Sequence, residues 1–200
     1  MSSEDDRSRE GSHRVRWSTP AAWVDVVRSD LDAFLQDHAA CERKASATAM
    51  TLASHYRDKP VLVSAMVDLA CEELEHFRRV YAMLAARGTS LGADRKDDYV
   101  VRMLALVRRG PDAYMLDRLL VAGVVEARGA ERFRLLSEGL DGALAEQYRD
   151  FARGEARHAA LFARLAKAYF AANDVAGRVD ELFDAEADIA RSMPLRPALH

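Results

Sequence analysis

Four segments of this chain carry apolar residues at every third or fourth position, and each places a glutamate where a helical bundle normally has leucine. Spacing of this kind marks the inward face of an α-helix. Two of the glutamates are followed three residues later by a histidine, which gives the set Glu42, Glu73 with His76, Glu126, and Glu155 with His158. A carboxylate buried alone costs several kcal/mol, so four at matching positions require cations among them. The pattern therefore predicts four helices around a pair of metal ions.

The ligand types indicate which metal these residues would bind. Residues three apart project from one side of a helix, so each Glu-x-x-His offers an oxygen and a nitrogen donor. One such motif arises easily by chance in a chain rich in glutamate, whereas two of them together with two matching glutamates do not. Carboxylates with one histidine per metal suit iron or manganese better than zinc. The sequence therefore predicts two non-haem iron ions.

Proline, glycine and capping residues divide the chain into predicted helices. A short helix follows residues 18–20, and a second short helix spans 97–108 after a polar loop at 89–96. The four long helices are expected at about 30–56, 60–87, 111–137 and 142–172, followed by a final helix that is capped by Asn173 and Asp174 and ends before Met193. This predicts an all-α fold, a ferritin-like four-helix bundle with additional short helices and a long connection between the second and third long helices.

Composition bounds the number of domains. A chain of 200 residues that is 50% apolar can bury one sizeable core, so we expect a single domain over residues 17–193 and a short tail over 194–200. Residues 1–16 are polar and charged, which predicts a disordered arm. No run approaches eighteen uncharged apolar residues, so no membrane-spanning segment is expected. Cys41 and Cys71 have neither metal-binding nor redox spacing, and we expect reduced core thiols in a cytoplasmic protein rather than a disulfide.

Residues beside the predicted ligands leave two alternatives open. Ala45, Ala122 and Gly129 lie one turn from a ligand, where small side chains either leave room for oxygen and a substrate or allow the helices to approach closely. His38 lies one turn before Glu42 and is either a hydrogen-bonded core histidine or a seventh ligand, of which the core role is favoured. No catalytic side chain is predicted beyond the metal ligands.

Five local segments resemble a known family. They are CERKASATAM around Glu42, DKPVLV after the first long helix, CEELEHF around Glu73, VEARGAERF around Glu126 and GEARH around Glu155. Each segment alone is weak, but the set is specific in order and spacing over about residues 20–193. Together they resemble the MiaE-type tRNA hydroxylases. One departure is the pair Gly129 and Ala130, where small polar residues are expected, and it concerns the detail of the pocket.

The resemblance implies a monooxygenase with two iron ions that hydroxylates the isopentenyl side chain of 2-methylthio-isopentenyladenosine, next to the tRNA anticodon, with O2 as co-substrate. By similarity to this fold class, Glu42 and Glu126 are expected as terminal ligands and Glu73 and Glu155 as bridging ligands. The chain has no Cys-x-x-Cys, flavin or nicotinamide motif. Electrons are therefore expected from an external donor of the ferredoxin or reductase type.

Charge bears on the tRNA partner. A net charge of −3 argues against a protein that coats nucleic acid nonspecifically. If bound metal neutralises the four glutamates of the predicted site, the other residues have a net charge of −3 + 4 = +1. Contacts to the tRNA anticodon loop are expected from Lys and Arg side chains near the predicted site. The candidates are Arg43, Lys44, Arg57, Lys59 and Arg128, of which Arg128 has an inter-helix ion pair as its alternative.

Two other functions use the same sequence features. A ferritin-like iron-oxidising or peroxide-scavenging protein needs the same ligands, although the basic groups near Glu42 and the missing rubredoxin-like cysteine module disfavour it. A metal-free helical interaction protein is the simplest alternative. The sequence leaves the oligomeric state open between monomer and dimer.

Overall fold

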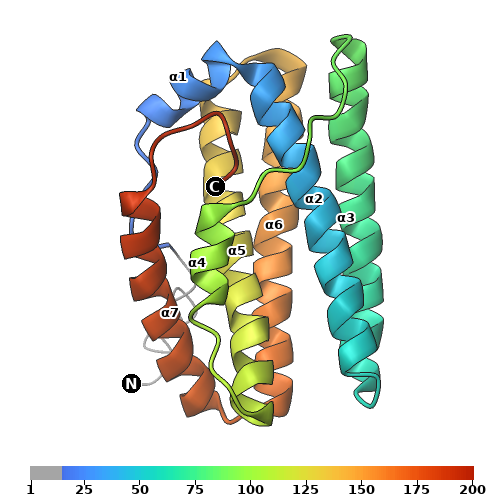
Figure 1. Ribbon diagram of the computed structural model, residues 1–200, viewed down its shortest axis with the longest axis vertical. Helices are drawn as coiled ribbons and strands as arrows, with labels where there is room; N and C mark the ends of the chain where they lie inside the picture. The colour runs from blue at the N-terminus through green and yellow to red at the C-terminus, as the bar shows by residue number, and fades with distance from the viewer. Residues whose placement is uncertain (1–14) are drawn as a thin grey trace, which may run out of the picture. The chain divides into compact units, whose positions relative to one another are not determined.

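The computed structural model describes residues 15–200, which contain seven helices and no strand, so the all-α prediction is confirmed for this part of the chain (Figure 1). Residues 1–14, most of the arm predicted over 1–16, lie outside the described residues. The rest forms two compact units. The α2–α3 unit comprises residues 22–96 and 195–199, and the α5–α6 unit comprises residues 15–21, 97–194 and His200. The prediction of one domain over 17–193 stays a prediction.

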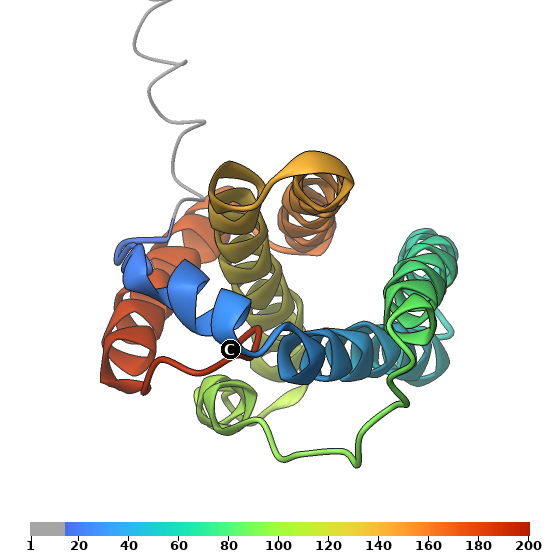
Figure 2. The ribbon, with the colours of Figure 1, turned by 90° about the horizontal axis from the view of Figure 1, so that it is seen from above.

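In the α2–α3 unit, two long helices form an antiparallel hairpin (Figures 1 and 2). The unit contains α1 (Ala22–Ser29), α2 (Leu31–His55) and α3 (Pro60–Ala86). Asp30 caps α2, since its side chain accepts a hydrogen bond from the backbone N–H of Ala33 at 3.0 Å. Pro60 begins α3, where its missing N–H costs nothing. After α3 the chain turns at Gly88, whose φ of +71° suits glycine.

The polar loop after α3 is fastened to α2 by side chains. Arg43 donates to both carboxylate oxygens of Asp94 at 2.7 and 2.6 Å, and Lys44 donates to the carbonyl of Arg95 at 3.0 Å. The side chain of Gln36 reaches the carbonyl of Ser90 at 2.8 Å. These contacts hold the loop along α2 and occupy two of the basic residues considered above.

The α5–α6 unit is a second antiparallel hairpin with two further helices against it (Figure 1). It contains α4 (Asp98–Leu104), α5 (Pro111–Gly139), α6 (Gly142–Tyr169) and α7 (Ala172–Ser192). Helices α5 and α6 are joined by a turn of two residues, and α7 packs on α5 and α4. Pro111 and Gly142 begin their helices near the predicted positions.

Two boundaries differ from the sequence prediction. The short helix α4 ends at Leu104 rather than Arg108, because the backbone N–H of Arg108 donates to the carboxylate of the buried Asp117 at 2.9 Å. The final helix α7 begins at Ala172, and no side chain caps it, so the predicted cap at Asn173 and Asp174 is wrong. At 21 residues, α7 is also a long helix.

The apolar faces predicted from periodicity are the buried faces. Leu35, Met66, Leu119 and Phe151 lie in the cores of their units and are at most 1% exposed. The glutamates on these faces are therefore held among apolar side chains. Within residues 15–200, none of the helices has the length and apolar character needed to span a bilayer.

Candidate metal centre

Glu42, Glu73 and His76 form a buried triad in the α2–α3 unit. Their exposed fractions are 4%, 1% and 7%. The Nδ1 atom of His76 lies 3.5 Å from Oε2 of Glu42 and 3.6 Å from Oε2 of Glu73. The two helices approach closely here, and the hydroxyl of Ser46 on α2 donates to the carbonyl of Ala70 on α3 at 2.9 Å. The α2–α3 hairpin thus gathers one carboxylate from α2 and a carboxylate and an imidazole from α3.

His38 belongs to the surroundings of this triad. It is fully buried, and its Nε2 lies 2.6 Å from Oε1 of Glu42, one turn further along α2. The other carboxylate oxygen, Oε2, faces His76. The predicted role of His38 as a hydrogen-bonded core histidine agrees with this contact.

Glu126, Glu155 and His158 form the corresponding triad in the α5–α6 unit. Glu155 and His158 are 5% and 3% exposed, and the side chain of Glu126 is 13% exposed. Nδ1 of His158 lies 4.0 Å from Oε2 of Glu126 and 3.8 Å from Oε2 of Glu155. Gly129 leaves room beside this triad, since a methyl group there would lie 3.6 Å from Cγ of Glu155. The two hairpins therefore carry triads of the same composition.

The spacing within each triad suits metal ligation. The nitrogen–oxygen distances of 3.5–4.0 Å are longer than a normal hydrogen bond. Two donors that each lie about 2.1 Å from a shared ion are separated by roughly 3–4 Å. Within each triad the ligand atoms lie within 4.8 Å of one another. Two carboxylates and one imidazole form a donor set that iron or manganese accepts. The residues present therefore fit one such ion per triad.

Arg128 is not available to a tRNA phosphate, which corrects the sequence prediction. It is 0% exposed, and its Nε and Nη2 atoms donate to the two oxygens of the buried Glu186 at 2.7 and 2.9 Å. It also donates to the carboxylate of Glu131 at 3.0 Å and the carbonyl of Trp17 at 2.8 Å. Burial lowers the pKa of Arg128, but the hydrogen bonds to Glu186 outweigh it and the pKa is raised. Arg128 therefore forms an ion pair between α5 and α7, which was the alternative to a tRNA contact.

Arg132 and Tyr99 extend this buried cluster. Burial and the charge of Arg128 lower the pKa of Arg132 to about 10, so it stays a cation at neutral pH. Tyr99 donates to Glu186 at 3.1 Å, and burial raises the pKa of its hydroxyl well above the usual value. Two arginines are thereby balanced by Glu131 and Glu186. The sequence spacing gave no signal for this cluster, because its members come from distant segments.

The other four basic candidates lie in the α2–α3 unit. Arg43 and Arg57 are exposed, and Lys44 and Lys59 are half-buried. Lys59 pairs with its neighbour Asp58 at 3.0 Å, while Arg43 and Lys44 hold the loop after α3. All four have surface positions from which a polyanion can be reached.

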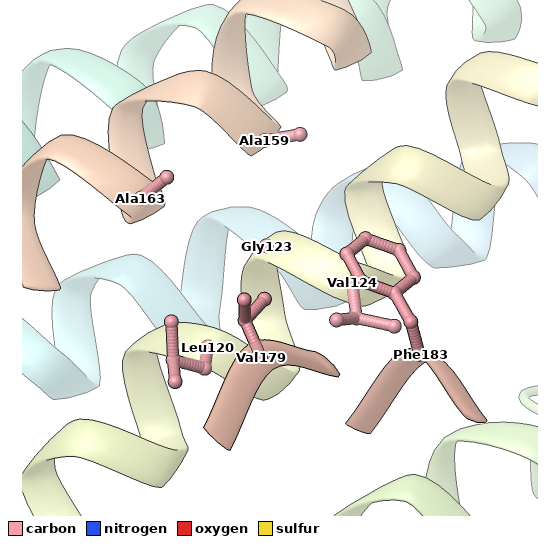
Figure 3. Close-up of a pocket in the computed structure, with 7 residues that line it drawn as sticks. All are labelled: Leu120, Gly123, Val124, Ala159, Ala163, Val179 and Phe183. Carbon is pink, nitrogen blue, oxygen red and sulfur yellow. The ribbon is translucent and has the colours of Figure 1, made fainter. Parts of the chain in front are cut away.

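A small apolar pocket lies between α5, α6 and α7 (Figure 3). Gly123 and Ala159 are among the residues that line it. Gly123 lies about one turn before Glu126 on α5, and Ala159 directly follows His158 on α6. A methyl group at Gly123 would approach Cβ of Phe162 to 3.1 Å, so the glycine permits close packing of α5 on α6. At this position the close-packing interpretation of small residues applies.

Neither Cys41 nor Cys71 forms a disulfide. Cys41 is half-buried, whereas Cys71 is exposed on α3, so the expectation that both are core thiols is wrong for Cys71. Glu72 and Glu75, which flank Glu73 along α3, are exposed.

Comparison with known proteins defines the family. Residues 9–200 match the family model described as tRNA-(MS2IO6A)-hydroxylase (MiaE). The chain belongs to the MiaE family. A Pseudomonas putida relative named tRNA 2-(methylsulfanyl)-N(6)-isopentenyladenosine(37) hydroxylase is 34% identical, with 87% of this chain and 85% of the relative covered. A relative of the same name from Salmonella typhimurium is 29% identical, with 87% and 82% covered.

A solved structure supports the fold of this MiaE family member. This structure is of protein 43 from Synechococcus, which is named for aldehyde deformylating oxygenase activity. It matches with a TM-score of 0.86 and a sequence identity of 36%, and the match covers 92% of each chain. The predicted ferritin-like fold is thereby confirmed. The family resemblance seen in the five sequence segments is confirmed as well.

Proposed function

We propose that this MiaE family member is an O2-dependent hydroxylase of the isopentenyl side chain of 2-methylthio-isopentenyladenosine beside the tRNA anticodon. We further propose two iron ions as its cofactor, held by Glu42, Glu73, His76, Glu126, Glu155 and His158. The observation that supports this most is the presence of two triads with the same donor types and similar nitrogen–oxygen distances, 3.5–3.6 Å in one and 3.8–4.0 Å in the other. The family of the chain and the names of both curated relatives support the tRNA substrate.

The protein's own residues have limited roles in this reaction. Iron, when bound, supplies oxygen activation for insertion into an unactivated C–H bond. The buried carboxylates balance the charge of the metal, and the imidazoles complete each donor set. The apolar side chains around both triads exclude water, which strengthens the electrostatic interactions there. Since these residues supply no electrons, we propose an external donor of the ferredoxin or reductase type.

Recognition of tRNA needs cationic side chains for the phosphates and space for an unstacked nucleotide. We propose Arg43, Lys44, Arg57 and Lys59 as phosphate contacts, because they are surface cations of the unit that carries Glu42. Replacing one of them should weaken tRNA binding and lower the slope of log affinity against log salt by about one. A tRNA substrate also implies a cytoplasmic enzyme.

The assay that tests this function gives the iron-loaded protein three substrates in parallel, with O2 and a reductant. The arms are tRNA that carries the methylthio-isopentenyl nucleoside, a long-chain aldehyde, and hydrogen peroxide. We expect a nucleoside heavier by one oxygen atom in the tRNA arm, detected by mass spectrometry of the digested tRNA. Absence of this product, with iron demonstrably bound, would overturn the proposal.

The other two arms examine competing functions. Deformylation of aldehydes is a candidate because the solved structure is named for that activity and is 36% identical to this chain. Peroxide turnover or formation of an iron mineral would favour the ferritin-like scavenger. We place both below tRNA hydroxylation because the family model covers residues 9–200 and both curated relatives carry the hydroxylase name.

A further inference from the structure

One exposed face of α6 carries a row of cations. Five basic side chains of this unbroken helix follow one another at intervals of three, four or seven residues, and all are exposed (Figure 1): Arg149, Arg153, Arg157, Arg164 and Lys167. Because an α-helix turns by about 100° per residue, these positions lie within a sector of about 80°. At a rise of about 1.5 Å per residue the row is about 27 Å long. We call this row the α6 stripe.

Acidic residues are few beside the α6 stripe. The exposed acidic residues of α6 are Glu146 and Asp150, both near its beginning, and Asp150 lies 3.5 Å from Arg153. The third acidic residue of the helix is Glu155, which is buried in the metal triad. Among the seven helices that the structure describes, α6 is the only one with more Lys and Arg than Asp and Glu, five against three. Helix α7 has two against six, so the unit separates its charges between these two helices.

The spacing of the α6 stripe is unfavourable for an isolated helix. Arg149, Arg153 and Arg157 are four residues apart, and like charges at this spacing repel each other across one helical turn. A solvated helix gains instead from opposite charges four residues apart, as Arg134 and Glu138 show on α5 with a distance of 2.7 Å. A helix face that repeats arginine is suited to an anionic partner.

The form of the α6 stripe favours a nucleic-acid backbone over a compact acidic protein as this partner. A phosphodiester chain is a linear array of negative charges, which a straight row of cations can follow. Four of the five cations are arginines, whose planar guanidinium groups can bind two phosphate oxygens at once. Ala156 and Ala160 lie on the same face, and their small side chains allow a backbone to approach the helix. A polyanion can therefore lie along α6.

We propose that the α6 stripe binds the phosphate backbone of the tRNA, in addition to the four cations proposed in the α2–α3 unit. This inference rests on the proposed tRNA substrate. Phosphate contacts fix the position and orientation of a nucleic acid but do not read its bases. The α6 stripe should therefore contribute equally to the binding of tRNA with and without the methylthio-isopentenyl group.

The test measures binding of these two tRNAs to the iron-loaded full chain by fluorescence anisotropy at several salt concentrations. The stripe variant is Arg149→Gln with Arg164→Gln. The matched control is Arg134→Gln with Arg191→Gln, which removes the same charge from exposed arginines of α5 and α7. Circular dichroism confirms that both variants are folded, and binding of a ferredoxin to the same proteins is measured in parallel.

We expect the stripe variant to bind both tRNAs more weakly, and by the same factor. The slope of log affinity against log salt should fall in magnitude by about two, one for each phosphate contact removed. The control should stay close to wild type.

A stripe variant with the affinity and slope of wild type, or a control that weakens binding as much, would overturn the role of the α6 stripe. Weaker binding of the ferredoxin with unchanged binding of tRNA would assign the stripe to the electron donor and overturn it as well. A wild type that binds neither tRNA would instead overturn the proposed tRNA hydroxylase function.

Discussion

At the scale of single residues, ionisable side chains occupy buried positions that a helical bundle normally fills with leucine. Within each triad two carboxylates lie beside one imidazole, at distances longer than a normal hydrogen bond. Such a group is costly without a cation, because like charges repel each other in a poorly solvated place. Metal binding and protein stability should therefore be coupled.

This coupling can be measured at Glu73. Replacing Glu73 by Gln removes a buried carboxylate, so the metal-free protein should be as stable as wild type or more stable. The rise in melting temperature on addition of ferrous iron should be largely lost. In wild type, iron at 100 times its dissociation constant should stabilise the fold by about 2.7 kcal/mol. The control is Glu75→Gln, since Glu75 is an exposed glutamate of the same helix and should keep the full response. An unaltered iron response in Glu73→Gln would contradict the ligand role.

Gly129 offers a steric test of the second triad. A methyl group there would lie at ordinary contact distance, 3.6 Å from Cγ of Glu155, so Gly129→Ala should fold and bind iron. Gly129→Leu should displace the Glu155 carboxylate and lower the iron content, which elemental analysis of the purified variant measures. Equal iron content in both variants would show that the space beside Glu155 does not matter for metal binding.

Periodicity was sufficient to predict all six candidate ligands on buried faces, because burial on a helix follows from spacing alone. It was not sufficient for Arg128. The sequence showed a cation two residues from Glu126, whereas its partner Glu186 lies 58 positions away and becomes a neighbour only through the packing of α7 on α5. The contact between His38 and Glu42 spans one helical turn, so spacing could indicate it, but the hydrogen-bond distance required the atomic positions.

At the scale of helices, the buried pair of Arg128 and Glu186 joins α5 to α7. Arg128→Met should destabilise the fold by about 3–5 kcal/mol, because it leaves the Glu186 carboxylate buried without its main counter-charge. The double variant Arg128→Met with Glu186→Met should recover much of this loss. Urea unfolding of the single and double variants measures the coupling. A double variant no more stable than Arg128→Met would mean that the two side chains are not energetically coupled.

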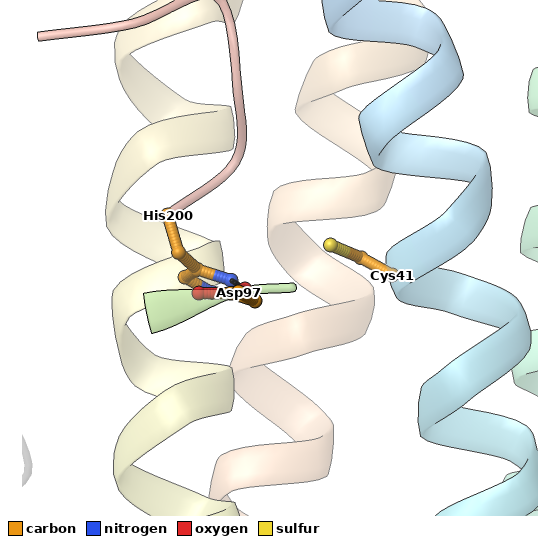
Figure 4. Close-up of side chains that lie close together, drawn as sticks. All are labelled: Cys41, Asp97 and His200. Carbon is orange, nitrogen blue, oxygen red and sulfur yellow. Dashed lines mark hydrogen bonds and ion pairs between the residues drawn. The ribbon is translucent and has the colours of Figure 1, made fainter. Parts of the chain in front are cut away.

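Asp97, the residue before α4, makes the stability of the protein depend on pH. Its Oδ1 accepts from the backbone N–H of Val100 at 3.1 Å, and its Oδ2 lies 3.0 Å from Nδ1 of His200 (Figure 4). Burial raises the pKa of Asp97, but the contacts with His200 and the backbone N–H groups outweigh it and lower the pKa from 3.8 to about 2. A lowered folded-state pKa stabilises the protein above the unfolded value. This contribution is lost as pH falls from about 4 towards 2.

The variant Asp97→Asn tests this pH dependence. Asparagine retains the helix cap but not the charge, so stability at neutral pH should fall by roughly 2 kcal/mol. The acid-induced loss of stability between about pH 4 and pH 2 should be smaller than in wild type. Chemical unfolding at several pH values measures both effects. A variant with the same acid dependence as wild type would contradict the assignment.

Helix starts were predictable where the backbone itself requires a residue type, as at Pro60 and Pro111. Helix ends were predictable where glycine adopts a positive φ, as at Gly88. The end of α4 was not, because Asp117, which binds the N–H of Arg108, lies on a different helix. Local rules therefore predict a boundary only when its cause is local.

At the scale of the whole molecule, family membership connects the metal residues to a substrate. The triads alone are compatible with several reactions of O2 or peroxide. The family match over residues 9–200 and the names of the curated relatives favour a tRNA substrate. The similar solved structure, however, belongs to a protein named for a different oxygenase activity. Oxygen insertion into tRNA is therefore the central claim to test.

The most direct measurement is the transfer of isotopically labelled O2 to tRNA by the iron-loaded protein with an added reductant. We predict that the methylthio-isopentenyl nucleoside gains one labelled oxygen atom with wild type and gains none with Glu73→Gln. The exposed-site variant Glu75→Gln should transfer the label as wild type does. Label that fails to enter the nucleoside with iron-loaded wild type, or that enters equally well with Glu73→Gln, would contradict an iron-dependent tRNA hydroxylase.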